Sequence, residues 1–336
     1  MHRNRNGLGL VEILAILAVI GITAAIAIPA IQAMREHSRK STCFNNLKTI
    51  VDAMKNYEIK IGSFPPGRVG CGCGDREPCL DTEGKPLQAF QRQATNGFAM
   101  ILPQLDAVPI LKRLLSSPGS VYPPSKEAKD ALIPDDDSRC MDDTTRGWLT
   151  PDIQSAMNER PAVFGCPSDK IPSSFPDRAS YAMCMGTHGA SMARRNVYDV
   201  KYRNDGAFIY HTTLSRNDFP DGLENTIFVG ETVDGHLAAT SNRWVVGVRL
   251  RDTLRSTELP INTFPLGDNA TGDSAAAEDL RTIEGGGFAS RHPHGANFGF
   301  GDGHASWLND DIDFPVYQAL STRSGSETVP KFEEIP

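Results

Sequence analysis

The longest apolar segment of the chain lies close to its amino end. Residues 8–28 carry one charged side chain, Glu12, in an otherwise uncharged and mostly apolar run. At about 1.5 Å per helical residue the run spans about 30 Å, the thickness of the hydrocarbon core of a bilayer. No other segment of the sequence approaches this length. We therefore expect one membrane-spanning segment, followed by a large body outside the membrane.

A second helical pattern follows this segment. Apolar residues recur at alternating spacings of four and three, with polar residues between them: Cys43, Leu47, Ile50, Met54, Tyr57 and Ile61. This spacing puts the apolar residues on one helix face. Gly62 and the following Pro65-Pro66 predict that the helix stops there. We predict one helix from Leu8 to about Ile61, on the order of 80 Å long, whose second half packs on a sheet.

The chain after Gly62 has the mixed pattern of an α+β body with long loops. The apolar segment Phe98–Leu115, interrupted by two prolines, predicts one or two short helices. Short apolar runs predict three strands, at Ala207–Tyr210, Thr226–Val229 and Trp244–Leu250. The polar segments 122–146 and 266–284 are typical of surface loops.

A β-hairpin is predicted near the carboxyl end. Gly301-Asp302-Gly303 has the composition of a turn and lies between Asn297–Phe300 and Ala305–Leu308. Alternation along the first strand places Phe298 and Phe300 on one face. We expect the apolar stripe of the long helix to cover that face.

Composition and charge exclude one class of function. The chain has 34 basic and 41 acidic residues and a net charge of −7, whereas a general nucleic-acid binder needs a cationic face. Basic residues flank both ends of the apolar segment, so the positive-inside rule does not orient it. Six of the seven cysteines follow residue 70, which favours an oxidising compartment for the body.

The apolar segment has three interpretations. A cleaved secretory signal would use Ala25-Ile26-Ala27 as its small-residue site, and a plain anchor would stay in the bilayer. The third interpretation starts from Glu12, because a carboxylate in a membrane helix is costly and normally has a functional partner. We favour this third interpretation.

Gly7 to Pro29, with the sequence GLGLVEILAILAVIGITAAIAIP, resembles a type IV prepilin signal. Such signals have a basic leader that ends in Gly, an apolar run and a Glu five residues after the cut. The resemblance implies cleavage after Gly7 by a prepilin peptidase, with Leu8 as the new amino terminus and Glu12 in assembly. Pro29 falls where pilins carry a helix-kinking proline. Leu8 and the residue after it depart from the usual Phe-Thr.

The rest of the chain is similar to a large bacterial family of prepilin-like proteins whose soluble domain has no assigned function. Four strings carry the resemblance: GCPSD at 165–169, SYAMCMG at 180–186, DGLENTIFVGE at 221–231, and the segment 290–327. CFNNLK at 43–48 and the later Pro65-Pro66 also resemble the helix that follows the membrane segment in that family. The hallmark is His292, nine residues, then Asp302-Gly303. Residues of about 67–160 have no family signature and form a variable loop region. The resemblance implies membrane export and a pilin-like fold, with the long helix on an antiparallel sheet, and it transfers no known activity.

Histidines and acidic residues near the predicted hairpin offer two metal hypotheses. His292, His294, Asp302 and His304 are imidazole and carboxylate groups that suit zinc if they converge. We favour a structural role instead, in which His292 and Asp302 hydrogen-bond and fix the shape of the glycine-rich turn together with Gly303. The acidic run 309–313 offers oxygen ligands for calcium, and calcium binding there is left as an open hypothesis. No cofactor, catalytic residue or enzyme signature is predicted.

The cysteines are expected to form disulfides. They lack the doubled C-x-x-C spacing of a zinc or redox centre. We expect at least two disulfides among Cys71, Cys73, Cys79, Cys140, Cys166 and Cys184. Alternatively Cys43 pairs with Cys166, because both lie in strings that resemble the family, and the bond then joins the helix to the body. Because seven is odd, at least one thiol stays unpaired or bonds another chain.

These observations predict a structural subunit. Residues 1–7 are the leader, 8–28 the transmembrane half of the helix, 29–62 its amphipathic half and 63–336 an extracytoplasmic domain. The subunit spans the inner membrane once, with its carboxyl-terminal domain in the periplasm or at the cell surface. Its partners are prepilin peptidase, other pilin-like subunits and an inner-membrane assembly platform of a type II secretion or type IV pilus-like system. The alternative is a membrane-tethered surface module that binds polysaccharide or a secreted substrate.

Overall fold

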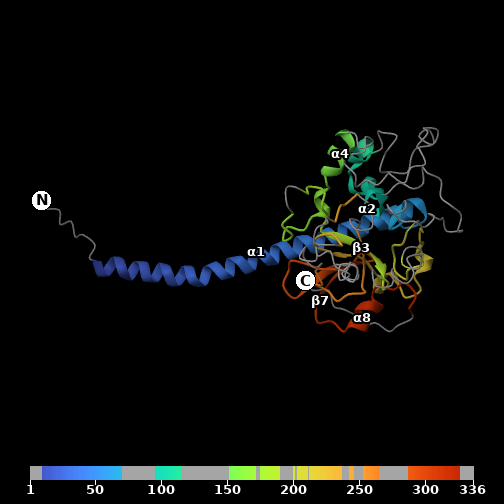
Figure 1. The fold of residues 1–336 in the computed structure, drawn as a ribbon. Helices are drawn as coiled ribbons and strands as arrows, with labels where there is room; N and C mark the ends of the chain where they lie inside the picture. Colours follow the sequence, from blue (N-terminus) through green and yellow to red (C-terminus); the bar gives the residue numbers. More distant parts are fainter. Residues whose placement is uncertain are drawn as a thin grey trace, which may run out of the picture.

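The computed structural model describes ten segments of the chain: residues 10–69, 95–114, 151–171, 175–189, 200, 203–210, 212–236, 242–245, 253–264 and 287–325. Within them a long helix projects from a mixed α+β body, as Figure 1 shows. Several sequence predictions lie outside the described residues: Gly7, Leu8, Cys71, Cys73, Cys79, Cys140 and the two predicted loops 122–146 and 266–284.

The predicted long helix is confirmed. Helix α1 spans Leu10–Ile61, 52 residues, with Pro29 inside it. At about 1.5 Å per residue it is about 80 Å long. It ends where the sequence predicts, because Gly62 takes a φ of 92° and donates its N–H to the carbonyl of Glu58 at 2.7 Å.

A five-stranded sheet forms the centre of the body, in the order β5-β3-β4-β6-β7. The strands are β3 (Tyr181–Gly186), β4 (Ile227–Glu231), β5 (Leu254–Ser256), β6 (Gly295–Phe300) and β7 (Ala305–Asn309). All neighbours are antiparallel except β3 and β5, which are parallel. The hairpin of β6 and β7 and the strand at β4 confirm two sequence predictions.

The two faces of the sheet are covered by different elements. Tyr181 and Met183 of β3 pack in one apolar cluster with the second half of α1, to which Leu47 and Met54 belong. The intervening Ala182 joins a second cluster on the other face, which includes helix α8 (Phe314–Ala319). The side chains of β3 thus alternate between the two clusters, as a strand buried on both faces requires.

The predicted facing of the hairpin phenylalanines is wrong. Phe298 and Phe300 belong to the cluster away from α1, and the ring of Phe298 contacts that of Phe288 with a centroid distance of 5.3 Å. The helix instead lies against Gly299, where an added Cβ would come within 2.8 Å of Val51 Cγ2. Because a phenylalanine ring has no room at this contact, the aromatic face turns to the opposite side.

The remaining elements are short. The predicted helices in the segment Phe98–Leu115 are α2 (Gly97–Met100) and α3 (Val108–Leu114), with a 3-10 turn η2 (Leu102–Leu105) between them. Further elements are β1 (Arg68–Val69), β2 (Thr95–Asn96), α4 (Pro151–Asn158), η4 (Ala162–Phe164), η5 (Arg216–Asp218) and η6 (Leu223–Asn225). Strands β1 and β2 form a separate two-stranded ribbon.

Of the two other predicted strands, Ala207–Tyr210 is not a strand, and of Trp244–Leu250 the structure describes Trp244 and Val245 alone. Ala207–Tyr210 makes scattered backbone bonds, with Phe208 donating to Cys184 at 3.0 Å, and only Tyr210 forms an isolated bridge. Trp244 begins a turn rather than a strand, and its indole donates to the carbonyl of Met157 at 2.7 Å. The run Ala207–Tyr210 is apolar because it is buried, and apolarity over a few residues does not distinguish a buried strand from a buried loop.

Candidate functional site

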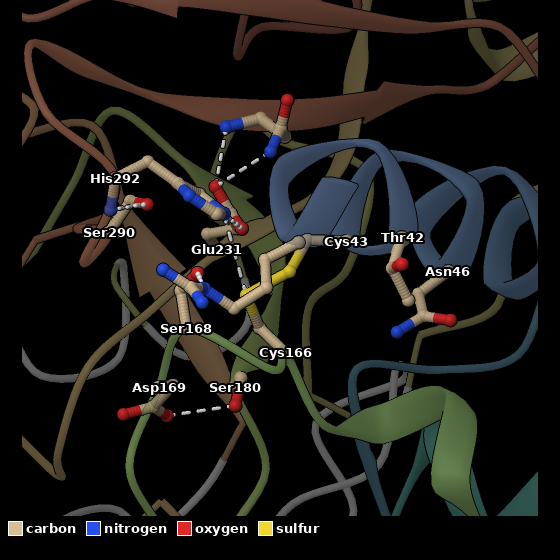
Figure 2. A network of polar contacts seen from close by, with 12 residues as sticks. Thr42, Cys43, Asn46, Cys166, Ser168, Asp169, Ser180, Glu231, Ser290 and His292 are labelled. Carbon is tan, nitrogen blue, oxygen red and sulfur yellow. Dashed lines mark hydrogen bonds and ion pairs between the residues drawn. A yellow bond between two sulfur atoms is a disulfide. The ribbon is translucent and has the colours of Figure 1, made fainter. Parts of the chain in front are cut away.

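A buried polar cluster lies where α1 enters the body, and His292 stands at its centre (Figure 2). The imidazole is fully buried between two carboxylates. Its Nδ1 lies 2.5 Å from Glu36 Oε1, and its Nε2 lies 3.2 Å from Glu231 Oε1. Glu36 comes from α1, Glu231 from the end of β4, and His292 from the segment just before β6. The cluster therefore links the long helix to the sheet.

Glu231 is held in place by the neighbouring strand. Its Oε2 accepts hydrogen bonds from the backbone N–H of Asn297 at 2.7 Å and from the side-chain amide of Asn297 at 3.1 Å. The residue is 2% exposed, and a buried carboxylate is costly unless it is paired or hydrogen-bonded. Its other oxygen, Oε1, faces the imidazole, with His292 Nε2 at 3.2 Å.

The carboxylate of Glu36 accepts hydrogen bonds both from α1 and from the body. Arg39 donates to it along the helix, with Nε 2.8 Å from Oε2, and Ser168 Oγ lies 3.0 Å from Oε1. Although partial burial raises the pKa of Glu36, hydrogen bonds from His292, Arg39 and Ser168 together hold it below its usual value.

The pKa of His292 is shifted upward, whereas that of Glu36 is shifted downward. Burial of the ring lowers its pKa, but the hydrogen bond and charge of Glu231, together with those of Glu36, raise it above its ordinary value. The cluster thus favours an imidazolium that bridges two carboxylates.

A disulfide lies beside this cluster. Cys43 of α1 is bonded to Cys166, 123 residues further along the chain, and the Sγ of Cys166 lies 3.5 Å from His292 Nε2. The alternative pairing that the sequence leaves open is therefore present in the structure. Cys184, also a predicted disulfide cysteine, is instead a free buried thiol in the second cluster, and burial raises its pKa to about 12.

Comparison with known proteins gives one result for this chain. A family model described as a protein of unknown function (DUF1559) matches residues 32–315. The chain belongs to this family. No curated protein and no solved structure matches it. The DUF1559 match includes both cysteines of the disulfide and the three charged residues around it, and it begins after the apolar segment.

The four residues predicted as an alternative metal set are divided by β6 in this DUF1559 chain. Asp302 and His304 lie at the hairpin turn, where Asp302 Oδ1 is 2.6 Å from His304 Nδ1. His292 and His294 precede the strand, and the six residues of β6 separate them from the turn by about 20 Å. The predicted hydrogen bond between His292 and Asp302 is therefore wrong.

The turn has its own stabilising contacts. Asp302 accepts the backbone N–H of His304 at 3.0 Å, and Gly303 takes a φ of 105°. Lys55 of α1 donates to the carbonyl of Asp302 at 2.6 Å, which joins the turn to the helix.

In the acidic run 309–313, the carboxylate of Asp310 accepts a hydrogen bond from the side-chain amide of Asn262 at 2.9 Å.

Glu36 and Glu231 are not among the residues that the sequence singles out. Glu36 has a detectable signal, because Glu36, Lys40, Cys43 and Leu47 follow the same four-three-four spacing as the apolar stripe. Charged residues on a stripe that is buried elsewhere indicate buried polar partners. Lys40 has an aromatic partner instead, since its Nζ lies 3.2 Å from the ring centroid of the half-buried Trp307. Glu231 ends a string that resembles the family, but nothing local marks its role.

Proposed function

We propose that this chain is a membrane-anchored, pilin-like structural subunit. In this proposal a prepilin peptidase cuts it after Gly7, and it then assembles, or is displayed, outside the inner membrane. Neighbouring subunits contact one another through the first half of α1, in a type II secretion or type IV pilus-like system. The body stands in the periplasm or at the cell surface.

The observation that carries the proposal is the exposed apolar rod formed by residues 10–34 (Figure 1). Its large apolar side chains are open on every side, with Leu10 75%, Val11 77% and Ile26 71% exposed. Soluble proteins rarely expose apolar patches larger than a few hundred Å². Among the described helices, α1 alone is long and apolar enough to cross a membrane. Such a rod requires lipid or the helices of other subunits around it.

A polar band separates the rod from the body. The polar residues Arg35, Glu36, Arg39 and Lys40 follow Met34, the last residue of the rod, and the buried stripe begins at Cys43. Basic side chains at this position suit the boundary between lipid and water. In the proposed arrangement the body therefore stands just outside the bilayer when the rod is inside it.

Two contacts join the body to α1 just after the rod ends. A covalent bond at Cys43 and the buried contact between Glu36 and His292 both join α1 to the sheet at the start of the body. An orientation imposed on the rod by neighbouring subunits is therefore passed on to the body. This is a useful property for a subunit that has to present its surface in register.

Glu12 lies inside the apolar half of α1. In a low-dielectric environment an unpaired carboxylate is costly. In the proposed assembly the carboxylate pairs with the amino terminus that cleavage frees on a neighbouring subunit. This pairing favours one axial register between helices.

The amino terminus of the native protein tests the processing step. We expect the mature chain to begin at Leu8 with a methylated amine, and a bulky residue in place of Gly7 should leave the leader attached. Mass spectrometry of protein purified from membranes measures both. A mature chain that begins near residue 28 would instead indicate ordinary signal cleavage and refute the proposal.

Sedimentation of sheared surface material tests assembly. We expect Glu12→Ala to reduce the sedimenting fraction at least several-fold while the body stays folded, because the register contact is lost. Glu159→Ala is the matched control, since this carboxylate lies on the surface of the body and contacts only the exposed Arg113 in the described structure. Equal sedimentation of the two variants would contradict the proposed role of Glu12. A monomeric protein that binds glycans would support the tethered binding module instead.

A further inference from the structure

Four potential metal-binding atoms meet at the helix–sheet junction. They are the Sγ atoms of Cys43 and Cys166, a nitrogen of His292 and a carboxylate oxygen of Glu231, and all lie within 4.8 Å of one another. All four residues are buried. Two sulfurs, an imidazole and a carboxylate are ligands that zinc accepts in tetrahedral sites. The sulfurs are bonded to each other in this structure, so they are available as thiolates only after reduction.

We propose that the chain binds one Zn²⁺ ion at this junction when the bond between Cys43 and Cys166 is reduced. The disulfide and the zinc ion are then alternative links between α1 and the body. The inference does not depend on assembly, because it concerns the body and the adjoining part of α1 alone.

The measured distances fit a tetrahedral zinc ion. With zinc–sulfur and zinc–nitrogen bonds of about 2.3 and 2.05 Å, the sulfur–nitrogen edge is about 3.6 Å and the nitrogen–oxygen edge about 3.3 Å. The corresponding distances are 3.5 Å from Cys166 Sγ to His292 Nε2 and 3.2 Å from His292 Nε2 to Glu231 Oε1. Two edges of the site are already in place. After reduction, rotation of the cysteine side chains brings the sulfurs to an edge of about 3.8 Å.

The surrounding groups are arranged as they are around zinc ligands. A ligating histidine normally gives its second nitrogen to a carboxylate, and His292 Nδ1 lies 2.5 Å from Glu36 Oε1. Asn297 holds one oxygen of Glu231, which leaves Oε1 for the metal. In the oxidised protein that oxygen faces His292 Nε2 at 3.2 Å, so both atoms already point to the position that the ion would take.

Conversion of the disulfide into the zinc site takes place in two steps, reduction and then metal binding. A dithiol reductant supplies two electrons and two protons, the bond between Cys43 and Cys166 breaks to two thiols, and the reductant becomes a disulfide. Zinc then displaces the two thiol protons and any proton on His292 Nε2. In the reverse direction the two thiolates exchange with an external disulfide. The intramolecular bond forms, two external thiolates leave, and the ion is released.

Zinc titration of the full chain in detergent micelles tests the site. The other cysteines are removed first, so that they do not bind the metal: Cys71, Cys73, Cys79 and Cys140 become Ser, and Cys184 becomes Ala. After reduction with a phosphine, which unlike a dithiol does not compete for the metal, zinc is titrated against a chromophoric chelator. We expect one Zn²⁺ per reduced chain and none at this site in the oxidised chain. Cobalt in place of zinc should give a thiolate charge-transfer band.

Variants at the cluster distinguish this site from others. Glu36→Gln should weaken zinc binding by about 10–100-fold, the usual effect of losing a carboxylate behind a ligating histidine. Glu231→Gln keeps the shape of the side chain and should weaken binding more than Glu36→Gln, because a ligand is lost. His304→Ala, at the far end of the hairpin, is the matched control and should change nothing.

Several results would overturn the inference. They are a reduced chain that stays folded by circular dichroism without binding zinc, a reduced chain that unfolds although zinc is present, and equal zinc affinity in Glu231→Gln and the parent. Equal binding by the oxidised chain would also contradict the site, because the disulfide occupies two of its ligands.

Discussion

The bond between Cys43 and Cys166 allows a stability prediction worked from the structure. Replacing both residues by alanine removes the covalent link between α1 and the body without burying a new polar group. The loop that the bond closes spans a sequence separation of 123 residues. The chain-entropy relation for a loop of this length gives about 16 cal/mol/K, which is about 4.9 kcal/mol at 25 °C. Native disulfides contribute about 2–5 kcal/mol in practice, so we expect a loss within that range.

Urea unfolding of the full chain in detergent micelles measures this loss, with a chelator present so that no metal substitutes for the bond. Trp244 and Trp307, both in the body, report unfolding by fluorescence. Cys184→Ala is the matched control, because it truncates a buried free thiol without breaking a cross-link and should cost only about 1 kcal/mol. Adding a reductant should lower the unfolding free energy of the parent protein to that of the double variant. A double variant as stable as the Cys184→Ala protein would refute the reasoning.

Two further predictions concern the contact between α1 and the sheet. Gly299→Val places a side chain within 2.8 Å of Val51 Cγ2, so it should lower the unfolding free energy by about 1–3 kcal/mol, measured by the same urea titration. Unchanged stability would mean that the helix does not approach the strand so closely. In the oxidised, metal-free protein the melting temperature should depend on pH in two directions. The pKa of His292 is raised from 6.5 in the folded state, so its stabilisation is complete below that pH and is lost as pH rises through the raised pKa. The pKa of Glu36 is lowered from 4.5, so its stabilisation is present above that pH and is lost as pH falls through the lowered pKa. His292→Gln should remove the alkaline decline, and a melting temperature that keeps it would assign the decline to another group.

Local patterns in the sequence were enough to predict several elements. The course of α1 follows from an apolar run and a four-three spacing, and its end follows from Gly62, which tolerates the positive φ that a helix stop requires. The turn at Asp302 follows from side-chain chemistry within three residues. These features depend on neighbours in the sequence, so the residues themselves carry the information.

Only the tertiary structure decided how these elements face one another. Phe298 alternates as predicted, but which cluster it joins depends on where α1 comes close, and Gly299 sets that contact. The parallel pairing of β3 and β5 likewise joins segments that no local pattern relates. A period of two divides a strand into two faces without saying which face lies under the helix.

The polar cluster around His292 depends most clearly on the tertiary structure. Glu36 and His292 are 256 residues apart, and Cys43 and Cys166 are 123 residues apart. The absence of a doubled C-x-x-C spacing argues against a zinc site only when neighbouring residues supply the ligands. Here α1, β4 and two loops each bring one of the four potential ligands. The apolar rod, the long helix and the hairpin can be predicted from the residues alone, because they follow from local periodicity. Folding alone placed a histidine, two carboxylates and two sulfurs together, because the energy that holds them comes from burying groups that are distant in the chain.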